Sequence, residues 1–397
     1  MLPYARPSIT EAEIDEVEAC LRSGWLATGP RTARFEEELA SRLGTAHAVA
    51  ASTGTAALHL AVLVAGIGPG DEVVTTPMTW VSTANVLLHA GAVPVFVDVE
   101  PDTLNLDTKR IEEALTPRTR ALLPVHYAGL PCDEDALLEI ARARRLKIVE
   151  DAAHALGASY KGRPIGGIGD VTMFSFHPAK NLTTGEGGAL STDDEALAAR
   201  ARRLRFHGID QTPESRFGGR GPAAYDVVEA GFKYNMSDLQ AAIGIHQLAR
   251  LDERNRRRRE LAMRYRELLR SVPHVEPLAD PSYEHEHAWH MLVVRIEPAA
   301  LAIERDDVIQ ELRSRGIGAG VHFVPLHLQT LYRDRTDPKR LPVATEAHRR
   351  ILTLPLFPDM RDGDVDFVVE VLATVIRENE RGRVAAEARG QRGEGAS

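Results

Sequence analysis

The sequence predicts an α/β fold: a large domain with a mostly parallel sheet, followed by a small C-terminal α+β domain. Between about residues 47 and 195, short β-branched runs alternate with helical patterns, which is the order of strands and crossover helices in a parallel sheet. A long basic helical stretch follows near 237–272, and after it two strand patterns flank one helical pattern. The 397 residues suffice for one large or two ordinary domains.

Apolar periodicity and turn residues define the individual elements. In the large domain we expect strands over 72–77, 93–99, 121–125, 147–151, 171–176 and 188–192. We expect helices there over 10–23, 55–66, 81–91 and 133–145. The first of these begins with Thr10 and Glu13 at the spacing of a capping box. In the small domain we expect strands over 291–296 and 319–323, with a helix over 306–316.

These patterns divide the chain into three parts. The first is a large domain with an N-terminal arm (1–250), and the second is the small domain (251–380). The third is a polar, Gly-rich tail (381–397), which we expect to be disordered.

Composition and charge exclude several classes of protein. An apolar content of 44%, a charged content of 26% and a net charge of −9 are typical of a soluble globular protein and argue against a nucleic-acid partner. The sequence has no signal core and no run of the roughly eighteen apolar residues that a membrane span needs. The two cysteines, Cys20 and Cys132, indicate a reducing compartment without a disulfide framework. We therefore expect a cytoplasmic protein without a membrane partner.

Polar residues follow several of the predicted strands, at the edge where open α/β sheets bind ligands. In ASTGTAAL (51–58) a polar turn opens a helix, so its N–H groups and hydroxyls either hold an anion or serve as an ordinary N-cap. Asp151 ends an apolar strand, where a buried carboxylate either meets a cation or caps the next helix. His154 lies one helical turn further on and faces the same ligand or makes a structural hydrogen bond.

Lys180 follows the strand 171–176 in SFHPAKNLTTGEGG (175–188). A lysine in a cleft can form a Schiff base with an aldehyde, whereas most lysines lie on the surface. The combination with an anion-binding turn, a strand-end aspartate and Trp80 favours the first interpretation, because together they form a cradle for pyridoxal phosphate. The helix would bind the phosphate, Trp80 would stack on the ring, Asp151 would keep the ring nitrogen protonated, and Lys180 would carry the aldehyde.

The same segments resemble the DegT-type sugar aminotransferases, a branch of the fold-type-I pyridoxal-phosphate enzymes. The resemblance spans nearly the whole chain in the order of the family, with matches at 23–36, 51–59, 70–85, 124–129, 150–162, 174–188, 206–208, 231–244 and 354–360. It implies that the predicted α/β fold is that of a fold-type-I transferase.

The resemblance also implies roles for single residues. Lys180 would hold the cofactor and later move the proton, Asp151 would pair with the ring nitrogen, and His154 would lie near the ring hydroxyl, with Trp80 stacked on the ring. Residues implied to bind the phosphate are Gly54, Thr55, Ser175 and, from the neighbouring subunit, Asn235. The role of Asn235 requires a homodimer with two shared active sites.

Within the family, segments such as HAWH (287–290), GIGAGVHF (316–323) and TLPLFPDM (353–360) resemble the aminotransferases that make UDP-4-amino-4-deoxy-L-arabinose. This resemblance implies ping-pong transfer of the amino group of L-glutamate to the 4-keto carbon of a UDP- or dTDP-linked pentose or 6-deoxyhexose, with release of 2-oxoglutarate. The nucleotide and the sugar stay open. His322 and His327 are the expected substrate contacts, although each can equally be structural.

Four other interpretations fit less well. A sugar dehydratase of the same fold would carry histidine in place of Lys180, and a non-catalytic regulator would have lost Lys180 or Asp151. A nicotinamide oxidoreductase is disfavoured because PIGGIGDV (164–171) precedes a strand instead of following one. No metal is expected, because strand alternation would place His285 and His287 on one face and His290 on the other.

Overall fold

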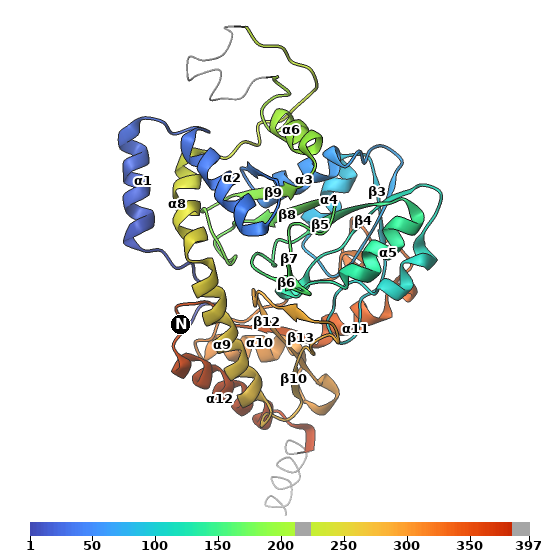
Figure 1. Cartoon of the computed structure of the whole chain (residues 1–397). Helices are drawn as coiled ribbons and strands as arrows, with labels where there is room; N and C mark the ends of the chain where they lie inside the picture. Colours follow the sequence, from blue (N-terminus) through green and yellow to red (C-terminus); the bar gives the residue numbers. More distant parts are fainter. Residues whose placement is uncertain (211–223, 383–397) are drawn as a thin grey trace, which may run out of the picture.

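A seven-stranded sheet lies at the centre of the larger part of the protein (Figure 1). The structure is a computed structural model that describes residues 1–210 and 224–382. The sheet has the order β1-β9-β8-β5-β4-β2-β3. Its strands are β1 (His47–Ala51), β2 (Glu72–Thr75), β3 (Val93–Phe96), β4 (Thr119–Leu123), β5 (Lys147–Asp151), β8 (Val171–Ser175) and β9 (Gly188–Thr192). All neighbours from β8 to β3 are parallel, and only β9 is antiparallel to its partners. The predicted mostly parallel α/β fold is confirmed.

Helices cover both faces of this sheet, so alternate residues of a strand belong to different cores, as β1 shows. Val49 and Ala51 of β1 pack into the core that contains α3, whereas Ala48 and Ala50 pack into the core of α2 and α8. The helices of this part are α1 (Glu11–Ser23), α2 (Pro30–Leu43), α3 (Gly54–Val64), α4 (Ser82–His89), α5 (Glu134–Arg144), α6 (Glu195–Leu204) and α8 (Asp238–Ala249). The capping box predicted from Thr10 and Glu13 opens α1.

A second, antiparallel sheet in the order β10-β12-β13 lies in the C-terminal part of the chain. Its strands are β10 (Val275–Pro277), β12 (Leu292–Ile296) and β13 (Ile351–Leu354). The helices of this part are α9 (Leu251–Leu269), α10 (Arg305–Ser314), α11 (Pro342–Arg350) and α12 (Asp362–Glu378). A separate core joins α9, α10 and α12 to this sheet. The expected strand 291–296 and helix 306–316 are therefore present.

The division into domains stays a prediction, although α8 and α9 meet at residue 250. Most of the tail predicted to be disordered lies outside the described residues, which end at Gly382. Within the described ranges, none of the helices combines the length and the apolar character that crossing a membrane requires.

Two of the expected elements are wrong in detail. The single helix expected near 237–272 is two helices, because Arg250 leaves the helical conformation between them. The break lets α8 pack on α1 and α2 while α9 packs on α12. The segment 319–323 is not a strand. It makes one isolated bridge, between Gly320 and Thr353, and its next three residues leave the sheet and line a cavity.

Two segments connect the C-terminal part to other regions of the chain. The short strand β11 (His285–Glu286) pairs with β6 (Ser159–Tyr160), which in turn pairs with β7 (Arg163–Pro164). At the N-terminus, Leu2 exchanges backbone hydrogen bonds with Gly316 and Gly318. The first residues of the chain therefore lie against the C-terminal part.

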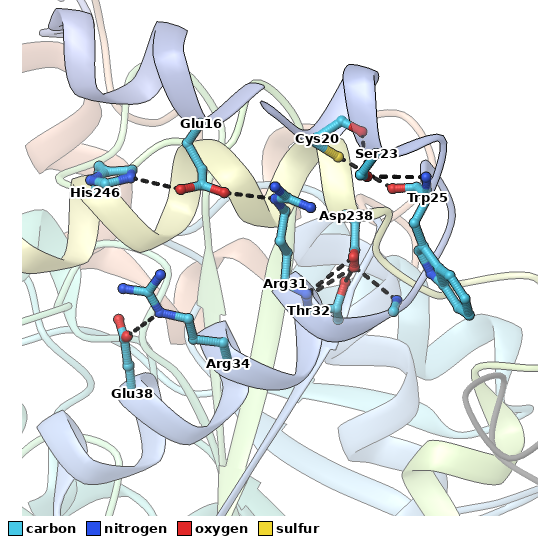
Figure 2. A network of polar contacts seen from close by, with 11 residues as sticks. Glu16, Cys20, Ser23, Trp25, Arg31, Thr32, Arg34, Glu38, Asp238 and His246 are labelled. Carbon is cyan, nitrogen blue, oxygen red and sulfur yellow. Dashed lines mark hydrogen bonds and ion pairs between the residues drawn. The ribbon is translucent and has the colours of Figure 1, made fainter. Parts of the chain in front are cut away.

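Asp238, the first residue of α8, connects this helix to the start of α2 (Figure 2). The carboxylate is fully buried and accepts hydrogen bonds from the backbone N–H groups of Gly29, Arg31 and Thr32 and from the Thr32 hydroxyl, at 2.8 to 3.0 Å. It thus supplies acceptors for the N–H groups at the start of α2, which a helix cannot satisfy internally. Glu16 of α1 adds bonds to the side chains of Arg31 and His246.

We predict that Asp238→Ala lowers the free energy of unfolding by about 3 kcal/mol, because it leaves several buried donors without an acceptor. Urea denaturation followed by circular dichroism measures this change. The matched control is Glu18→Ala, which removes an exposed ion pair with Arg22 and should cost less than about 1 kcal/mol. If both substitutions lower the free energy of unfolding equally, the buried carboxylate contributes no more to stability than an exposed ion pair.

Candidate active site

A cavity of about 680 Å³ lies at the carboxyl edge of the parallel strands. Loops after β1, β2, β5 and β8 line it, together with residues 321–323 and the N-terminal Tyr4. Eight of the site residues expected from the sequence line this one cavity: Gly54, Thr55, Trp80, Asp151, His154, Ser175, Lys180 and His322. Their proximity is what a common ligand requires, and their individual roles stay predictions.

Asp151 is the last residue of β5 and is almost fully buried. Its Oδ2 accepts a hydrogen bond from the Thr83 hydroxyl at 2.8 Å, and its Oδ1 accepts one from the Ala153 N–H at 3.1 Å. Burial raises the pKa of the carboxyl group, and these hydrogen bonds partly oppose the rise. Among the described residues, no arginine or lysine forms an ion pair with Asp151. The carboxylate is therefore placed to receive a cation from a ligand.

Lys180 lies in the loop after β8, where its backbone N–H donates to the His177 carbonyl at 2.8 Å. Removal of its amine from bulk water lowers the pKa of Lys180 to about 8, although the Asp151 carboxylate raises it. A lysine with this pKa is partly neutral near physiological pH. Its Nζ can therefore act as a nucleophile and as a base.

Three histidines surround the lysine and remain uncharged. The ring of His154 lies 4.5 Å from that of His290 and 5.8 Å from that of Phe323, measured between centroids. Burial lowers the pKa of His154 and His290 well below the usual value, and it lowers the pKa of His322 to about 4. The proximity of Lys180 adds to each shift, because two positive charges repel.

The start of α3 forms the end of the cavity expected to bind phosphate. The Thr53 hydroxyl caps this helix by accepting the Ala56 N–H at 3.0 Å. The N–H groups of Gly54 and Thr55 belong to the first turn, where a helix has no internal acceptor. A Cβ at Gly54 would lie 2.7 Å from the Cβ of Ser175, so only glycine lets β8 approach the helix so closely.

These observations fit pyridoxal phosphate. The first turn of α3 and Ser175 provide donors for a phosphate, and the buried Asp151, which forms no ion pair among the described residues, suits a protonated ring nitrogen. The Nδ1 of His154 is buried without a hydrogen-bond partner among the described residues, which leaves a polar group on this wall for a ligand. The site thus has the groups of an enzyme that works through pyridoxal phosphate.

The other expected site residues lie at the rim of the cavity or outside it. Trp80 is 59% exposed at the rim, with its ring centroid 6.1 Å from that of Phe323. Asn235 lines a different pocket, of about 510 Å³, together with Trp25 and Lys233. The expected contact of Asn235 with the cofactor phosphate of a neighbouring subunit therefore stays a prediction.

His327 does not line the cavity, so the structure gives no support to its expected contact with substrate. It is fully buried in the turn Leu326–Leu328, where its Nε2 lies 2.9 Å from the Thr345 hydroxyl of α11. These contacts fit the structural alternative, in which His327 anchors its turn to α11.

Sequence reasoning missed several residues of the site. Tyr4, Thr83, His290 and Phe323 were not recognised, because they reach the site through tertiary contacts. Thr83 had one local signal, since it lies in the polar start of an apolar helix, where a hydroxyl can bind a neighbouring group.

His126, Glu134 and Glu150 form a buried group, and Glu150 is the neighbour of Asp151 in β5. The side-chain atoms of these residues that could bind a metal ion lie within 4.8 Å of one another. The Nδ1 of His126 accepts the Cys132 N–H at 3.1 Å, so a neutral ring carries its proton on Nε2, which lies 3.5 Å from Glu150. The ring therefore has no free lone pair for a metal. Burial and the neighbouring Glu150 raise the pKa of Glu134 well above its usual range, so this group holds a proton. Within the described ranges, the histidines of HEHAWH do not form a comparable group.

Comparison with known proteins identifies the class. Residues 7–373 match the DegT/DnrJ/EryC1/StrS aminotransferase family, and the chain belongs to this family. The chain is 45% identical over 380 residues to the spore coat polysaccharide biosynthesis protein SpsC of Bacillus subtilis, covering 95% of this chain and 97% of SpsC. The protein is thus a pyridoxal-phosphate-dependent sugar aminotransferase.

Solved structures agree with this assignment. Spr1654 of Streptococcus pneumoniae, assigned as a sugar aminotransferase, matches in its PLP form with a TM-score of 0.88 at 36% identity, covering 95% of this chain and 98% of that one. DesI, solved in the presence of its TDP-sugar product, matches with a TM-score of 0.85 at 34% identity, covering 98% and 95% of the two chains.

We predict that covalent loading of the apoprotein with pyridoxal phosphate becomes faster as the pH rises through about 8, because only the neutral form of Lys180 attacks an aldehyde. Stopped-flow absorption in the visible range measures the loading rate. Below that pH the amine is protonated and loading should slow by about tenfold per pH unit. A rate that still rises steeply above about pH 10 would contradict the lowered pKa.

Proposed function

We propose that this aminotransferase moves the amino group of L-glutamate to the 4-keto carbon of a UDP- or dTDP-linked pentose or 6-deoxyhexose, releasing 2-oxoglutarate. The observation that carries the proposal is the placement of Lys180 beside a buried Asp151, in a cavity where burial keeps His154, His290 and His322 uncharged. The resemblance of 287–290, 316–323 and 353–360 to 4-amino-arabinose aminotransferases supports position 4 of the sugar.

The charge of the cavity suits a sugar as the amino acceptor. Among the described residues that line it, Asp151, Lys180 and Glu186 are the only Asp, Glu, Lys or Arg side chains. Its walls otherwise offer hydroxyl groups, imidazole nitrogens and the aromatic rings of Trp80 and Phe323. An uncharged polyol with an apolar ring face matches such walls. The similarity to DesI, which was solved with a TDP-sugar product, gives independent support for a nucleotide-linked substrate.

The residues of the chain divide the chemistry among them. Pyridoxal phosphate, when bound, supplies an aldehyde for the amino group and a ring that withdraws electrons from the reacting carbon. Asp151 would hold the protonated ring nitrogen, and the first turn of α3 would hold the phosphate. As a neutral amine, the Nζ of Lys180 would take the proton from Cα of glutamate and return it to the carbon on the other side of the amino nitrogen, two bonds away. The rings of His154 and Phe323 stack on each other and line the same cavity. Because both half-reactions use this site, ping-pong kinetics follow.

A homodimer with shared sites would supply the positive charge that the cavity lacks. No arginine, and no lysine other than Lys180, lines the cavity among the described residues, yet a cofactor phosphate and a nucleotide diphosphate carry several negative charges. Lys233 and Asn235 lie together at another pocket of the same chain. We propose that these two residues complete the site of the neighbouring subunit.

The function is tested by following the visible absorption of the purified holoprotein. L-Glutamate should bleach it, and one member of a panel of UDP- and dTDP-4-keto sugars should restore it while an amino sugar forms. Lys180→Ala should abolish turnover, whereas Lys147→Ala, which changes an exposed lysine paired with Asp170, should not. If L-glutamate does not change the absorption of the holoprotein, the proposed amino donor is wrong. If none of the 4-keto sugars restores the absorption, the proposed acceptor is wrong.

Shared active sites are tested with hybrid dimers of Lys180→Ala and Asn235→Ala chains. We expect each variant alone to be nearly inactive and the mixture to regain activity. If Asn235 serves the partner, a hybrid has one site with both substitutions and one site with none. Activity is measured after refolding the two chains together. No recovery in hybrids confirmed by mass spectrometry would place Asn235 outside the partner's site.

A further inference from the structure

His290 lines the cavity in a tautomer that its neighbours determine. The side-chain nitrogen of Asn181 donates to the Ala288 carbonyl at 2.7 Å and to the Asn255 side-chain oxygen at 2.8 Å. The Asn181 Oδ1 is therefore the atom that faces the Nδ1 of His290, at 3.2 Å. An amide oxygen only accepts hydrogen bonds, so Nδ1 of His290 carries the proton.

The other ring nitrogen of His290 is consequently an acceptor. A neutral imidazole with a proton on Nδ1 has a lone pair on Nε2. Burial and the nearby positive charges of Lys180 and Arg258 keep the pKa of His290 well below its usual value, so the ring stays neutral. Within the part of the chain that the structure describes, no hydrogen bond to Nε2 is found, and His290 lines the cavity.

The position of His290 is fixed from three sides. Its backbone N–H donates to the Ala128 carbonyl at 3.0 Å, Asn181 holds Nδ1, and the ring of His154 packs at 4.5 Å between centroids. The buried guanidinium of Arg258 holds the same segment by donating to the His290 carbonyl at 3.4 Å and to the Leu356 carbonyl at 2.8 Å. A ring held in this way presents its free lone pair in one direction, which is the preorganisation that specificity requires.

We infer that Nε2 of His290 accepts a hydrogen bond from the sugar hydroxyl beside the reacting carbonyl, which makes His290 a specificity-determining residue of the acceptor half-reaction. The inference rests on the proposed 4-keto sugar. In a 4-keto pyranose, C5 is bonded to the ring oxygen, so C3 is the neighbour of C4 that bears a hydroxyl group. Glutamate has no hydroxyl group beside its reacting carbon, so we expect this hydrogen bond in the acceptor half-reaction. A site built to accept a hydroxyl proton discriminates against an analogue without it.

Two substitutions separate this role from a structural one. His290→Asn can keep the bond to the Asn181 Oδ1 while it removes the acceptor from the cavity. His290→Gln can place an amide oxygen near the position of Nε2. We expect His290→Asn to lower kcat/KM for the accepted 4-keto sugar by about tenfold, and His290→Gln to recover part of this loss. The rate of bleaching by L-glutamate and the absorption of the bound cofactor should change less than about twofold in both variants.

The sharper measurement compares the accepted 4-keto sugar with its 3-deoxy analogue. Wild-type enzyme should prefer the hydroxylated sugar by about tenfold, and His290→Asn should lose most of this preference. Equal use of both sugars by wild-type enzyme overturns the inference without any variant. It is also overturned if His290→Asn slows bleaching by glutamate as much as amination of the sugar. If no 4-keto sugar is aminated although glutamate bleaches the enzyme, the proposed acceptor fails and the role of His290 fails with it.

Discussion

The burial of the Asp151 carboxyl group, which forms no ion pair among the described residues, is the constraint on which the rest of the site depends. The backbone of this residue is fixed in the sheet, because its N–H donates to the Pro124 carbonyl and its carbonyl accepts the His126 N–H. Thr83 and Ala153 provide two hydrogen bonds, which do not compensate for the loss of water around a full negative charge. In the role proposed for Asp151, the protonated ring nitrogen of pyridoxal phosphate would supply a cation for it. The affinity for the cofactor and the stability of the folded site are therefore linked through this carboxylate.

The surroundings of Lys180 follow from the same constraint on buried charge. Three histidines lie near the amine, and burial keeps all of them neutral. If they were protonated, they would repel the lysine and lower its pKa further, and they would attract anions into the space meant for an uncharged sugar. Neutral rings provide a polar surface without this effect. The arrangement also leaves the cavity short of positive charge for phosphates, which is why the proposed second subunit matters for the chemistry and not only for assembly.

The walls of the cavity come from segments that are far apart in the sequence. Tyr4 belongs to the N-terminal segment, whose Leu2 is bound to Gly316 and Gly318, and its ring stacks on His322 at 4.9 Å. His290 follows β11, which pairs with β6. Backbone hydrogen bonds thus tie each wall to a different part of the fold. A movement of the C-terminal part would change both the substrate contacts and the environment of Lys180.

The sequence by itself determined the mostly parallel character of the large sheet, the capping box of α1, the place of Asp151 at a strand end and that of Lys180 after a strand. These features are local, because periodicity, turn residues and the position of a polar residue after an apolar run can be read from neighbours in the chain. The tertiary structure alone decided that the helix expected near 237–272 breaks at Arg250, that 319–323 lines the cavity, and that His327 lies outside the site. It also brought Tyr4 and His290 into the site. Periodicity reports that a side chain is buried but not which distant segment it meets, and the chemistry of a buried group depends on that neighbour.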